Sequence, residues 1–496
     1  MIEKTMGVHK WLIISALLGV NAQLFAETNY YGIGESGNNS SKNEETIVES
    51  QWPKTMVSGT LPVLYVNTEG GVPILDKVTD IPAGLWIEIP EKCSSKEFEL
   101  GSVESPVALE IRGRGNSSWL QDKKPYKIKF EKKTEILGMP KHKHFALLPA
   151  HVSPVLGMEL ARQVGLGWAP RCEQVEFVLN DEYLGIYSLF ESVKIDSNRL
   201  DIFEQEDLCE DEEIIPYGWL VEIDNYEDEY QFVIDEPGRT RMMVTYKTPE
   251  ELSEKQYQWL YNEFSEIYDV IYSDNPADRE HWADYIDAKS MAQYFLVREI
   301  LEDYDGFCGS MYMYRDNEGE NSIWKMGPMW DPTFNAWTET NDWTMNHLPS
   351  LFATWKILPE IFHTEAFANA FLDVWNEFYP SKMEHIRNYI VEFGNKCAEA
   401  DIADTARWPN KNAVISGPSE NYLFGCMERK AKWIDANKVI EVKPSGIDSA
   451  LKDKRVVSIE TFTLLGSRIE NPSAGIYVRL TTYEDGSVSS EKIILK

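Results

Sequence analysis

Cysteine is scarce in this chain, and its spacing argues against two kinds of site. Among 496 residues there are six cysteines: Cys93, Cys172, Cys209, Cys308, Cys397 and Cys426. None stands in a CxxC pair, the spacing typical of structural zinc sites and of thiol redox pairs. We therefore expect neither kind of site. One or two disulfides remain open, and the sequence does not say which cysteines would pair.

The N-terminal segment lacks a hydrophobic run long enough to span a membrane. Lys4, His9 and Lys10 precede a mostly apolar run at residues 11–18, and a small residue suited to cleavage, Ala26, follows. A spanning helix needs about 20 apolar residues. Residues 1–26 therefore predict a cleaved signal peptide rather than an anchor helix. We expect an exported protein, extracellular or on the outer cell surface, whose mature form has no transmembrane span.

Positive charge is in deficit. The chain has 48 Lys and Arg against 81 Asp and Glu, a formal net charge of -33. This surplus repels phosphate backbones and anionic membranes. We therefore expect no nucleic-acid partner. The acidic surplus serves solubility, or else attracts divalent cations or basic substrates.

The chain is too long for one hydrophobic core, because single cores rarely exceed about 250–300 residues. Residues 27–52 are rich in Asn, Ser, Gly and Glu and predict a flexible linker. Residues 53–438 are expected to form the main domain, and residues 447–496 a small β-rich module. No internal repeat is visible, which disfavours a solenoid.

Local patterns in the main domain predict an α+β fold. Tyr126, Ile128 and Phe130 alternate with Lys127 and Lys129, which predicts a strand with both lysines on the face opposite the apolar one. A helix is expected over residues 153–163, and a hairpin over residues 175–190 with its turn at 180–181. Apolar residues at helical spacing predict two further helices, over residues 257–271 and 291–301.

Several longer strings together resemble the CotH (spore-coat protein H) family of atypical protein kinases. They are RGRGNSSW at residues 112–119, KKPYKIKF at 123–130, LNDEYLGIY at 179–187, LVEIDN at 220–225 and GPMWD at 327–331. The resemblance covers roughly residues 61–337. It implies an atypical protein-kinase-like domain that uses ATP with Mg²⁺ or Mn²⁺. The implied reaction transfers the γ-phosphate to Ser or Thr of a surface or secreted protein.

The resemblance also implies which cations meet the phosphates. Lys127 is the first candidate, Lys129 its competitor and Lys124 a more distant third, with Glu191 holding the lysine by an ion pair. In the Gly-rich turn, backbone amides are expected to approach phosphate. The turn residues that complete the expected nucleotide site are Arg112, Arg114 and Asn116.

Two aspartates are the implied catalytic and metal-binding residues. Asp331 is assigned to the divalent metal, with Asn335 as a further oxygen ligand, and Asp305 to the catalytic position, either as base or as second metal ligand. Ser310 stands where a protein kinase has Asn, and Thr333 where CotH relatives often have a second Asp. One metal ligand is therefore in doubt. Another source of oxygen ligands would be Glu222 with Asp224.

The β-rich C-terminal module resembles the sorting domains of the type IX secretion system of Bacteroidetes-type bacteria. Leu465-Gly466-Ser467-Arg468 and Gly475-Ile476-Tyr477 carry that likeness. The alternative is a small β-sandwich that only binds or packs.

Two rival functions stay open at this point. One is a surface adhesin or scaffold that kept the fold and lost the catalytic site. The other is glycan binding or hydrolysis, suggested by 16 Trp and paired carboxylates.

Overall fold

The computed structural model describes most of the main domain. The described residues are 51–93, 98–237, 239–336, 341–347, 357–409, 418–442, 456–463, 468–469, 475–483 and 488–495. The predicted signal peptide and nearly all of the predicted linker lie outside them, as does the start of the C-terminal module. No helix in these ranges is both long and apolar enough to cross a membrane.

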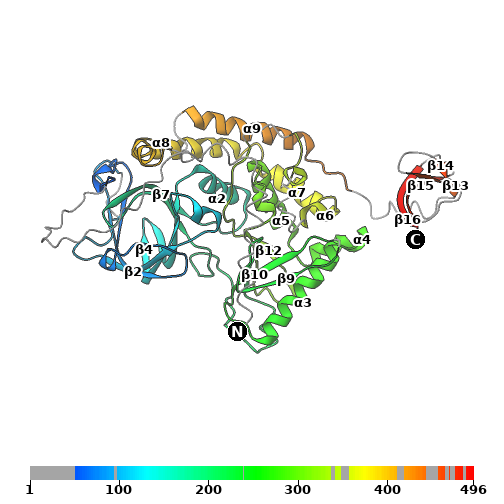
Figure 1. Cartoon of the computed structure of the whole chain (residues 1–496), viewed down its shortest axis with the longest axis horizontal. Coiled ribbons are helices and arrows are strands. Elements are labelled where there is room, and N and C mark those ends of the chain that lie inside the picture. Colours follow the sequence, from blue (N-terminus) through cyan, green and yellow to red (C-terminus); the bar gives the residue numbers. More distant parts are fainter. Residues whose placement is uncertain are drawn as a thin grey trace, which may run out of the picture. The chain divides into compact units, whose positions relative to one another are not determined.

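The first seven strands form a closed barrel (Figure 1). The strand order is β1-β2-β3-β4-β5-β7-β6, and β1 closes the barrel by pairing in parallel with β6. The strands are β1 Val63–Thr68, β2 Ile81–Glu88, β3 Val107–Gly113, β4 Tyr126–Ile136, β5 Met139–Pro149, β6 Cys172–Leu179 and β7 Glu182–Glu191.

Two local predictions are confirmed in this barrel. In β4, Tyr126, Ile128 and Phe130 are buried in the barrel interior, and Lys127 and Lys129 lie on the outer face. The hairpin of β6 and β7 turns at Asn180 and Asp181, with φ of 50° and 62°. Two successive positive φ values are what a two-residue type I′ turn requires, and Asn and Asp tolerate them.

The rest of the main domain, called here the C-terminal portion, combines a sheet with helices; it comprises residues 219–437 and also α2, which lies between β5 and β6 in the sequence. Its five-stranded sheet has the order β12-β11-β8-β10-β9. Those strands are β8 Trp219–Ile223, β9 Gln231–Ile234, β10 Met242–Thr248, β11 Met311–Arg315 and β12 Lys325–Met326. The helices are α2 Val152–Val164, α3 Glu254–Ile271, α4 Pro276–Arg279, α5 Ala288–Leu301, α6 Ile357–Ile361, α7 Glu365–Phe378, α8 Met383–Arg407 and α9 Pro418–Asn437.

Short 3-10 helices join these elements. They are η1 Lys54–Met56, η2 Glu69–Gly71, η3 Ser117–Leu120, η4 Glu280–Asp284, η5 Asp305–Phe307, η6 Gly319–Asn321 and η7 Thr344–His347. The predicted helices over residues 153–163, 257–271 and 291–301 correspond to α2, α3 and α5. The chain is therefore α+β, as its patterns indicate.

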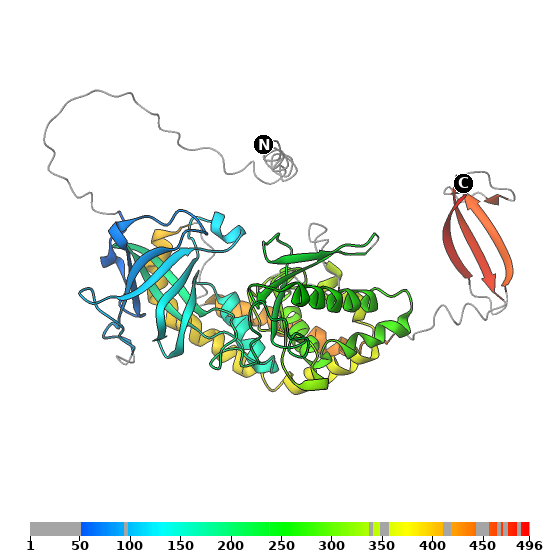
Figure 2. The same ribbon diagram turned by 90° about the horizontal axis from the view of Figure 1, so that it is seen from below.

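Helix α8 ties the C-terminal portion to the barrel. It packs against both α2 and the barrel strand β7, as the views in Figures 1 and 2 show. Near its end, the buried Asp404 carboxylate pairs with Lys123 Nζ at 2.7 Å and accepts the backbone N–H of Ile186 at 2.9 Å. The barrel end that carries Lys123 is thereby fixed against a helix residue 281 positions further along the chain.

The last strands form a separate four-stranded antiparallel sheet of order β14-β13-β15-β16. They are β13 Val456–Thr463, β14 Arg468–Ile469, β15 Gly475–Tyr483 and β16 Val488–Leu495. No disulfide joins any of the six cysteines in the described part of the chain.

Candidate functional site between the barrel and the C-terminal portion

A row of side chains on the outer face of the barrel is the starting point of the site. Arg112, Lys127, Ala146 and Phe190 stand opposite one another across β3, β4, β5 and β7. The Phe190 ring contacts that of Trp330, with centroids 6.4 Å apart. The segment that leads into Asp331 therefore lies against the barrel face that carries Lys127.

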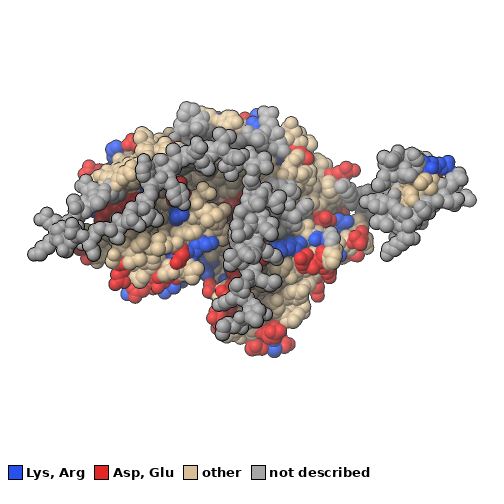
Figure 3. Space-filling model, viewed as in Figure 1, with Lys and Arg blue, Asp and Glu red and all other residues tan. Residues whose placement is uncertain are grey.

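Lys127 is the cation that the structure leaves available on this face. Among the described residues its ammonium makes no ion pair or hydrogen bond. Burial, and after it the nearby charges of Arg112 and Lys194, lower its pKa to about 8. Figure 3 shows a few Lys and Arg side chains among the Asp and Glu side chains of the face that it draws. A half-buried cation without an ion-pair partner is suited to an anionic ligand.

The two competing lysines have other partners. Lys129 pairs with Glu110 at 3.2 Å in an exposed ion pair. Lys124 donates to the backbone carbonyls of Trp119 and Gln121 at 2.9 and 3.1 Å, which places it on the η3 turn. The structure thus separates the three lysines that the sequence left as alternatives.

The expected ion pair between Lys127 and Glu191 is not formed. Glu191 is fully buried and holds Arg171 in a two-pronged ion pair, at 2.8 and 2.9 Å. In the sheet register Glu191 stands opposite Phe145, whose ring is in the barrel interior. Because side chains opposite each other share a face, Glu191 points away from the face of Lys127.

The side chains of the three predicted residues of the Gly-rich turn contact different parts of the protein. Arg112 reaches Asp80 at 3.3 Å, and the Asn116 side chain accepts a hydrogen bond from Lys77 at 3.1 Å. Arg114 instead extends to the C-terminal portion, with its guanidinium 5.2 Å from the centre of the Trp330 ring. Burial lowers the pKa of Arg114, and the charge of Asp331 opposes this, which shows that the two lie close.

Two amides of this turn are already used within the protein. The N–H of Gly113 donates to Asp76 O at 3.0 Å, and that of Arg114 donates to Pro125 O at 3.2 Å. The N–H groups of Gly113 and Arg114 are therefore not free to bind phosphate. A Cβ at Gly113 would lie 2.4 Å from the Trp119 ring, so close packing explains this glycine.

Asp303 organises the acidic loop after α5, a role that the sequence reasoning missed. It is fully buried, pairs with Arg298, and accepts the N–H of Gly306 at 3.3 Å and that of Thr333 at 3.0 Å. One carboxylate thus fixes the loop of Asp305 and the segment after Asp331. The sequence feature that could have indicated this role of Asp303 is Arg298, one turn before the end of α5. That feature is informative only once the end of the helix is known.

Asp305 and Asp331 are brought together. Partial burial raises the pKa of Asp305, and the neighbouring charges of Asp303 and Asp331 raise it further, while Arg298 opposes them. Asp331 has a φ of 47°. A bound cation would reduce the repulsion between these two carboxylates.

The segment around Asp331 is held on three sides. Arg298 donates to the carbonyl of Trp330 at 2.8 Å. Pro332 packs on Gly157 of α2, where an added Cβ would come within 2.2 Å of the proline ring. The backbone N–H of Asn335 donates to Leu301 O at 2.9 Å, which places Asn335 beside the end of α5.

The alternative oxygen ligands lie at the end of β8. Glu222 is buried and pairs with Lys247 at 2.8 Å, so its charge is already matched. Asp224 lies against Gly309, because a Cβ there would be 3.0 Å from its Oδ1. Burial raises the pKa of both carboxyl groups.

The donor set suits a divalent cation that also binds a ligand. Among the described residues no group of three or more His, Cys, Asp or Glu is placed to hold a metal by itself. Mg²⁺ typically takes one or two carboxylates and completes its shell with water and phosphate oxygens. Asp305 and Asp331, which lie close enough for the charge of one to affect the other, are the carboxylates that could contribute to such a shell.

The chain is thus an α+β protein in which a barrel that carries Lys127 and Arg114 adjoins loops of the C-terminal portion that carry Asp305 and Asp331. Within that class the chain belongs to the CotH kinase protein family, whose model matches residues 111–441. The match includes every predicted site residue from Arg112 to Asn335. No curated protein matches the chain.

Proposed function

We propose that this protein is an ATP- and divalent-metal-dependent protein kinase with a kinase-like fold, acting on Ser or Thr of a surface or secreted protein. The observation that carries the proposal is the position of Asp331. It lies beside Arg114 and Asp305, in a segment packed on the barrel face where the Lys127 ammonium lacks a counterion among the described residues. Phosphoryl transfer depends mostly on positioning and charge neutralisation, and these residue types supply both.

Each side chain has a role in this scheme. Lys127 and Arg114 bind phosphate oxygens from the barrel side. Asp331 would hold a divalent cation, with Asp305 as its neighbour. When bound, Mg²⁺ or Mn²⁺ neutralises charge on the transferred phosphoryl group.

Asp305 has two compatible roles, base or second metal ligand. As base it accepts the proton of the Ser or Thr hydroxyl while that oxygen forms a bond to the γ-phosphorus. The bond from the γ-phosphorus to the ADP oxygen then breaks. The raised pKa of Asp305 makes its carboxylate a stronger base than an ordinary Asp side chain.

Export belongs to the same proposal. The motivation is the N-terminal signal pattern and the β-rich C-terminal sheet, for which we propose a type IX sorting role. Detection of the protein in the cytoplasm with residues 1–26 intact would contradict it.

The decisive experiment is phosphate transfer by the purified protein. We expect transfer to itself or to generic basic proteins with Mg²⁺ or Mn²⁺, reduced at least about 100-fold in Asp331→Ala. Asp373→Ala, which removes an exposed carboxylate from α7, is the matched control and should keep wild-type activity. The proposal fails if the wild type transfers no phosphate with either metal and nucleotide does not raise its melting temperature.

A catalytically inactive scaffold is the second candidate. It is favoured by Thr333, whose backbone N–H serves Asp303 and whose position lacks a second carboxylate. On this view Asp331→Ala leaves adhesion or partner binding unchanged. Metal-dependent ATP turnover by the wild type decides against it.

A further inference from the structure

The strand β9 forms an open edge of the five-stranded sheet in the C-terminal portion, beside α3 (Figure 1). It pairs with β10 on one side, and no described strand pairs with it on the other. Tyr230 O, just before the strand, accepts the N–H of Tyr246 in β10 at 3.0 Å. Because backbone groups alternate between the two sides of a strand, the N–H and C=O groups of Gln231 and Val233 point away from β10. An edge of this kind is a template for a further strand.

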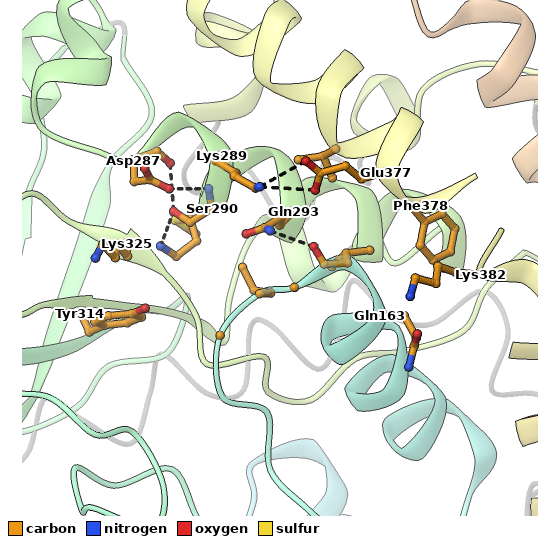
Figure 4. A pocket seen from close by; sticks show the side chains of 16 residues that line it. Gln163, Asp287, Lys289, Ser290, Gln293, Tyr314, Lys325, Glu377, Phe378 and Lys382 are labelled. Atoms are coloured by element: carbon orange, nitrogen blue, oxygen red, sulfur yellow. Dashed lines mark hydrogen bonds and ion pairs between the residues drawn. The ribbon is translucent and has the colours of Figure 1, made fainter. Parts of the chain in front are cut away.

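The opposite edge of the same sheet is protected. Directly before β12, Trp324 O accepts the N–H of Asp287 at 2.8 Å, so the segment before α5 lies along that edge. Lys325 on β12 lies in the wall of a cavity of about 510 Å³ beside the start of α5 (Figure 4), and it pairs with Glu318 at 2.7 Å. Lysines, prolines and covering segments are common protections of a sheet edge. Residues 225–236, which contain β9, include no Lys, Arg or Pro.

The side chains at the β9 edge include exposed apolar groups. Val233 is 41% exposed, and Tyr226 and Tyr230, which precede the strand, are 48% and 45% exposed. Phe232, in contrast, is buried, and its ring contacts that of Phe264 in α3. Since successive side chains point to opposite faces, β9 is held to α3 through one face and offers Val233 on the other.

Acidic residues flank this edge on both sides. They are Glu227, Asp228, Glu229, Asp235 and Glu236, and all are exposed. Asp228 lies 3.6 Å from Lys247, and Glu236 pairs with Arg239 at 2.9 Å. The other three have no ion-pair partner within the described part of the chain. Like charges on neighbouring strands are destabilising, so the edge disfavours a second copy of itself and favours a segment with basic residues.

The open edge is in register with the candidate site. Val233 stands opposite Met243 in β10, and Met243 O accepts the N–H of Asp224, at the end of β8, at 3.3 Å. Asp224 lies against Gly309, whose N–H donates to the carbonyl of Asp305 at 3.0 Å. Strands lie about 4.8 Å apart, so a strand added beside β9 would be about 14 Å from Asp224, the span of about four or five extended residues.

We propose that the open edge of β9 binds, as an added β-strand, an extended segment of a partner protein in which basic and apolar residues alternate. Backbone hydrogen bonds to Gln231 and Val233 hold the segment, an apolar side chain covers Val233, and the basic side chains meet the flanking carboxylates. The proposal rests on the proposed function in one respect: it identifies this partner as the protein substrate, whose Ser or Thr reaches Asp305.

Fluorescence anisotropy of the full chain with a labelled peptide of sequence KVKVSVKVK tests the binding. We expect saturable binding without nucleotide or metal. A peptide with prolines in place of the valines keeps the charge but lacks the N–H donors that would meet Val233. It should bind at least about 10-fold more weakly, because hydrogen bonds to the edge are lost. A peptide with glutamates in place of the lysines should not bind measurably.

Val233→Lys is the variant that tests the edge itself. It replaces the exposed apolar side chain by a charge of the same sign as the peptide, and should weaken binding about 10-fold. Val457→Lys is the matched control, the same substitution at an exposed valine of β13, and should leave the affinity unchanged. Melting temperatures of both variants report that they are folded.

Three results would overturn the proposal. They are no saturable binding of the basic peptide, equal affinity for the proline peptide, and undiminished binding by Val233→Lys. A chain that sediments as a dimer, and as a monomer once Val233→Lys is made, would assign the edge to a second copy instead. Asp331→Ala should lose phosphate transfer and keep peptide binding, so failure of the kinase proposal and failure of this one are told apart.

Discussion

At the scale of single residues, the site depends on which charges are already matched. Glu222 and Glu191 look like site carboxylates in the sequence, yet Lys247 and Arg171 neutralise them. Lys127 has no such partner among the described residues, and its pKa falls to about 8, mainly through burial. An anion bound beside Lys127 would therefore raise this pKa towards its ordinary value.

The first residue-scale prediction concerns pH. Below about pH 8 the folded protein carries Lys127 as a cation, and above it the side chain is neutral. The affinity for Mg·ADP should therefore fall about 10-fold as pH rises through 8. A loss of this size is expected because one charge-assisted hydrogen bond disappears when the lysine becomes neutral, and such a bond contributes about that much. Calorimetric titrations with Mg·ADP over roughly pH 6.5 to 9.5, a range that brackets this one titration, measure the change.

Lys127→Arg is the control for this prediction. Arginine stays charged throughout that range, so the affinity of this variant for Mg·ADP should not fall as pH rises. Lys129→Arg should behave like the wild type, because Lys129 pairs with Glu110 on another part of the strand. A wild-type affinity that is flat across pH 8 would contradict the role of Lys127.

At the scale of elements, α2 and the segment of Asp331 meet at one close contact. Gly157 leaves room for Pro332, and the helix on which it lies is otherwise buried over most of its length. The sequence predicts a helix over residues 153–163, which contains Gly157. Nothing in the sequence of that helix, however, indicates that residue 157 contacts residue 332.

Gly157→Ala should therefore act on both stability and the site. The added methyl group overlaps the proline ring, which costs about 1–3 kcal/mol of the free energy of unfolding, as overpacking does. Displacement of Asp331 should lower phosphotransfer as well. Chemical denaturation and activity measure the two effects.

Gly425→Ala is the matched control for that substitution. Gly425 lies on α9, where an added Cβ meets nothing within 4 Å. Alanine there should be neutral or slightly stabilising, because it favours helix over the unfolded chain. Equal stability losses in the two variants would count against the Pro332 contact.

At the scale of the whole molecule, one buried ion pair links the barrel to α8. Asp404 is fully buried, Lys123 nearly so, and the same carboxylate serves the backbone of β7. Since the pair joins residues far apart in the chain, it contributes to folding of the barrel and helices as one unit.

Asp404→Ala should lower the free energy of unfolding by about 3–5 kcal/mol, because it leaves Lys123 buried without that partner. The double variant Lys123→Met with Asp404→Leu should recover much of this loss. Denaturant unfolding followed by tryptophan fluorescence measures both. A double variant less stable than Asp404→Ala would show that the charges themselves are required.

The sequence by itself determined the local structure and the candidate residues. Alternation at residues 126–130 set the faces of β4, Asn180 and Asp181 set the hairpin turn, and helical spacing set α3 and α5. These features depend on neighbours within a few residues, so short-range periodicity and turn chemistry suffice to predict them.

Only the tertiary structure decided which charged groups face one another. It paired Glu191 with Arg171, sent Arg114 to Trp330, and placed Asp303 between two loops. Each of these contacts joins residues far apart in the chain or crosses between elements, and no local pattern encodes such pairings. The closed barrel arises in the same way, because its closure needs β1 to meet β6.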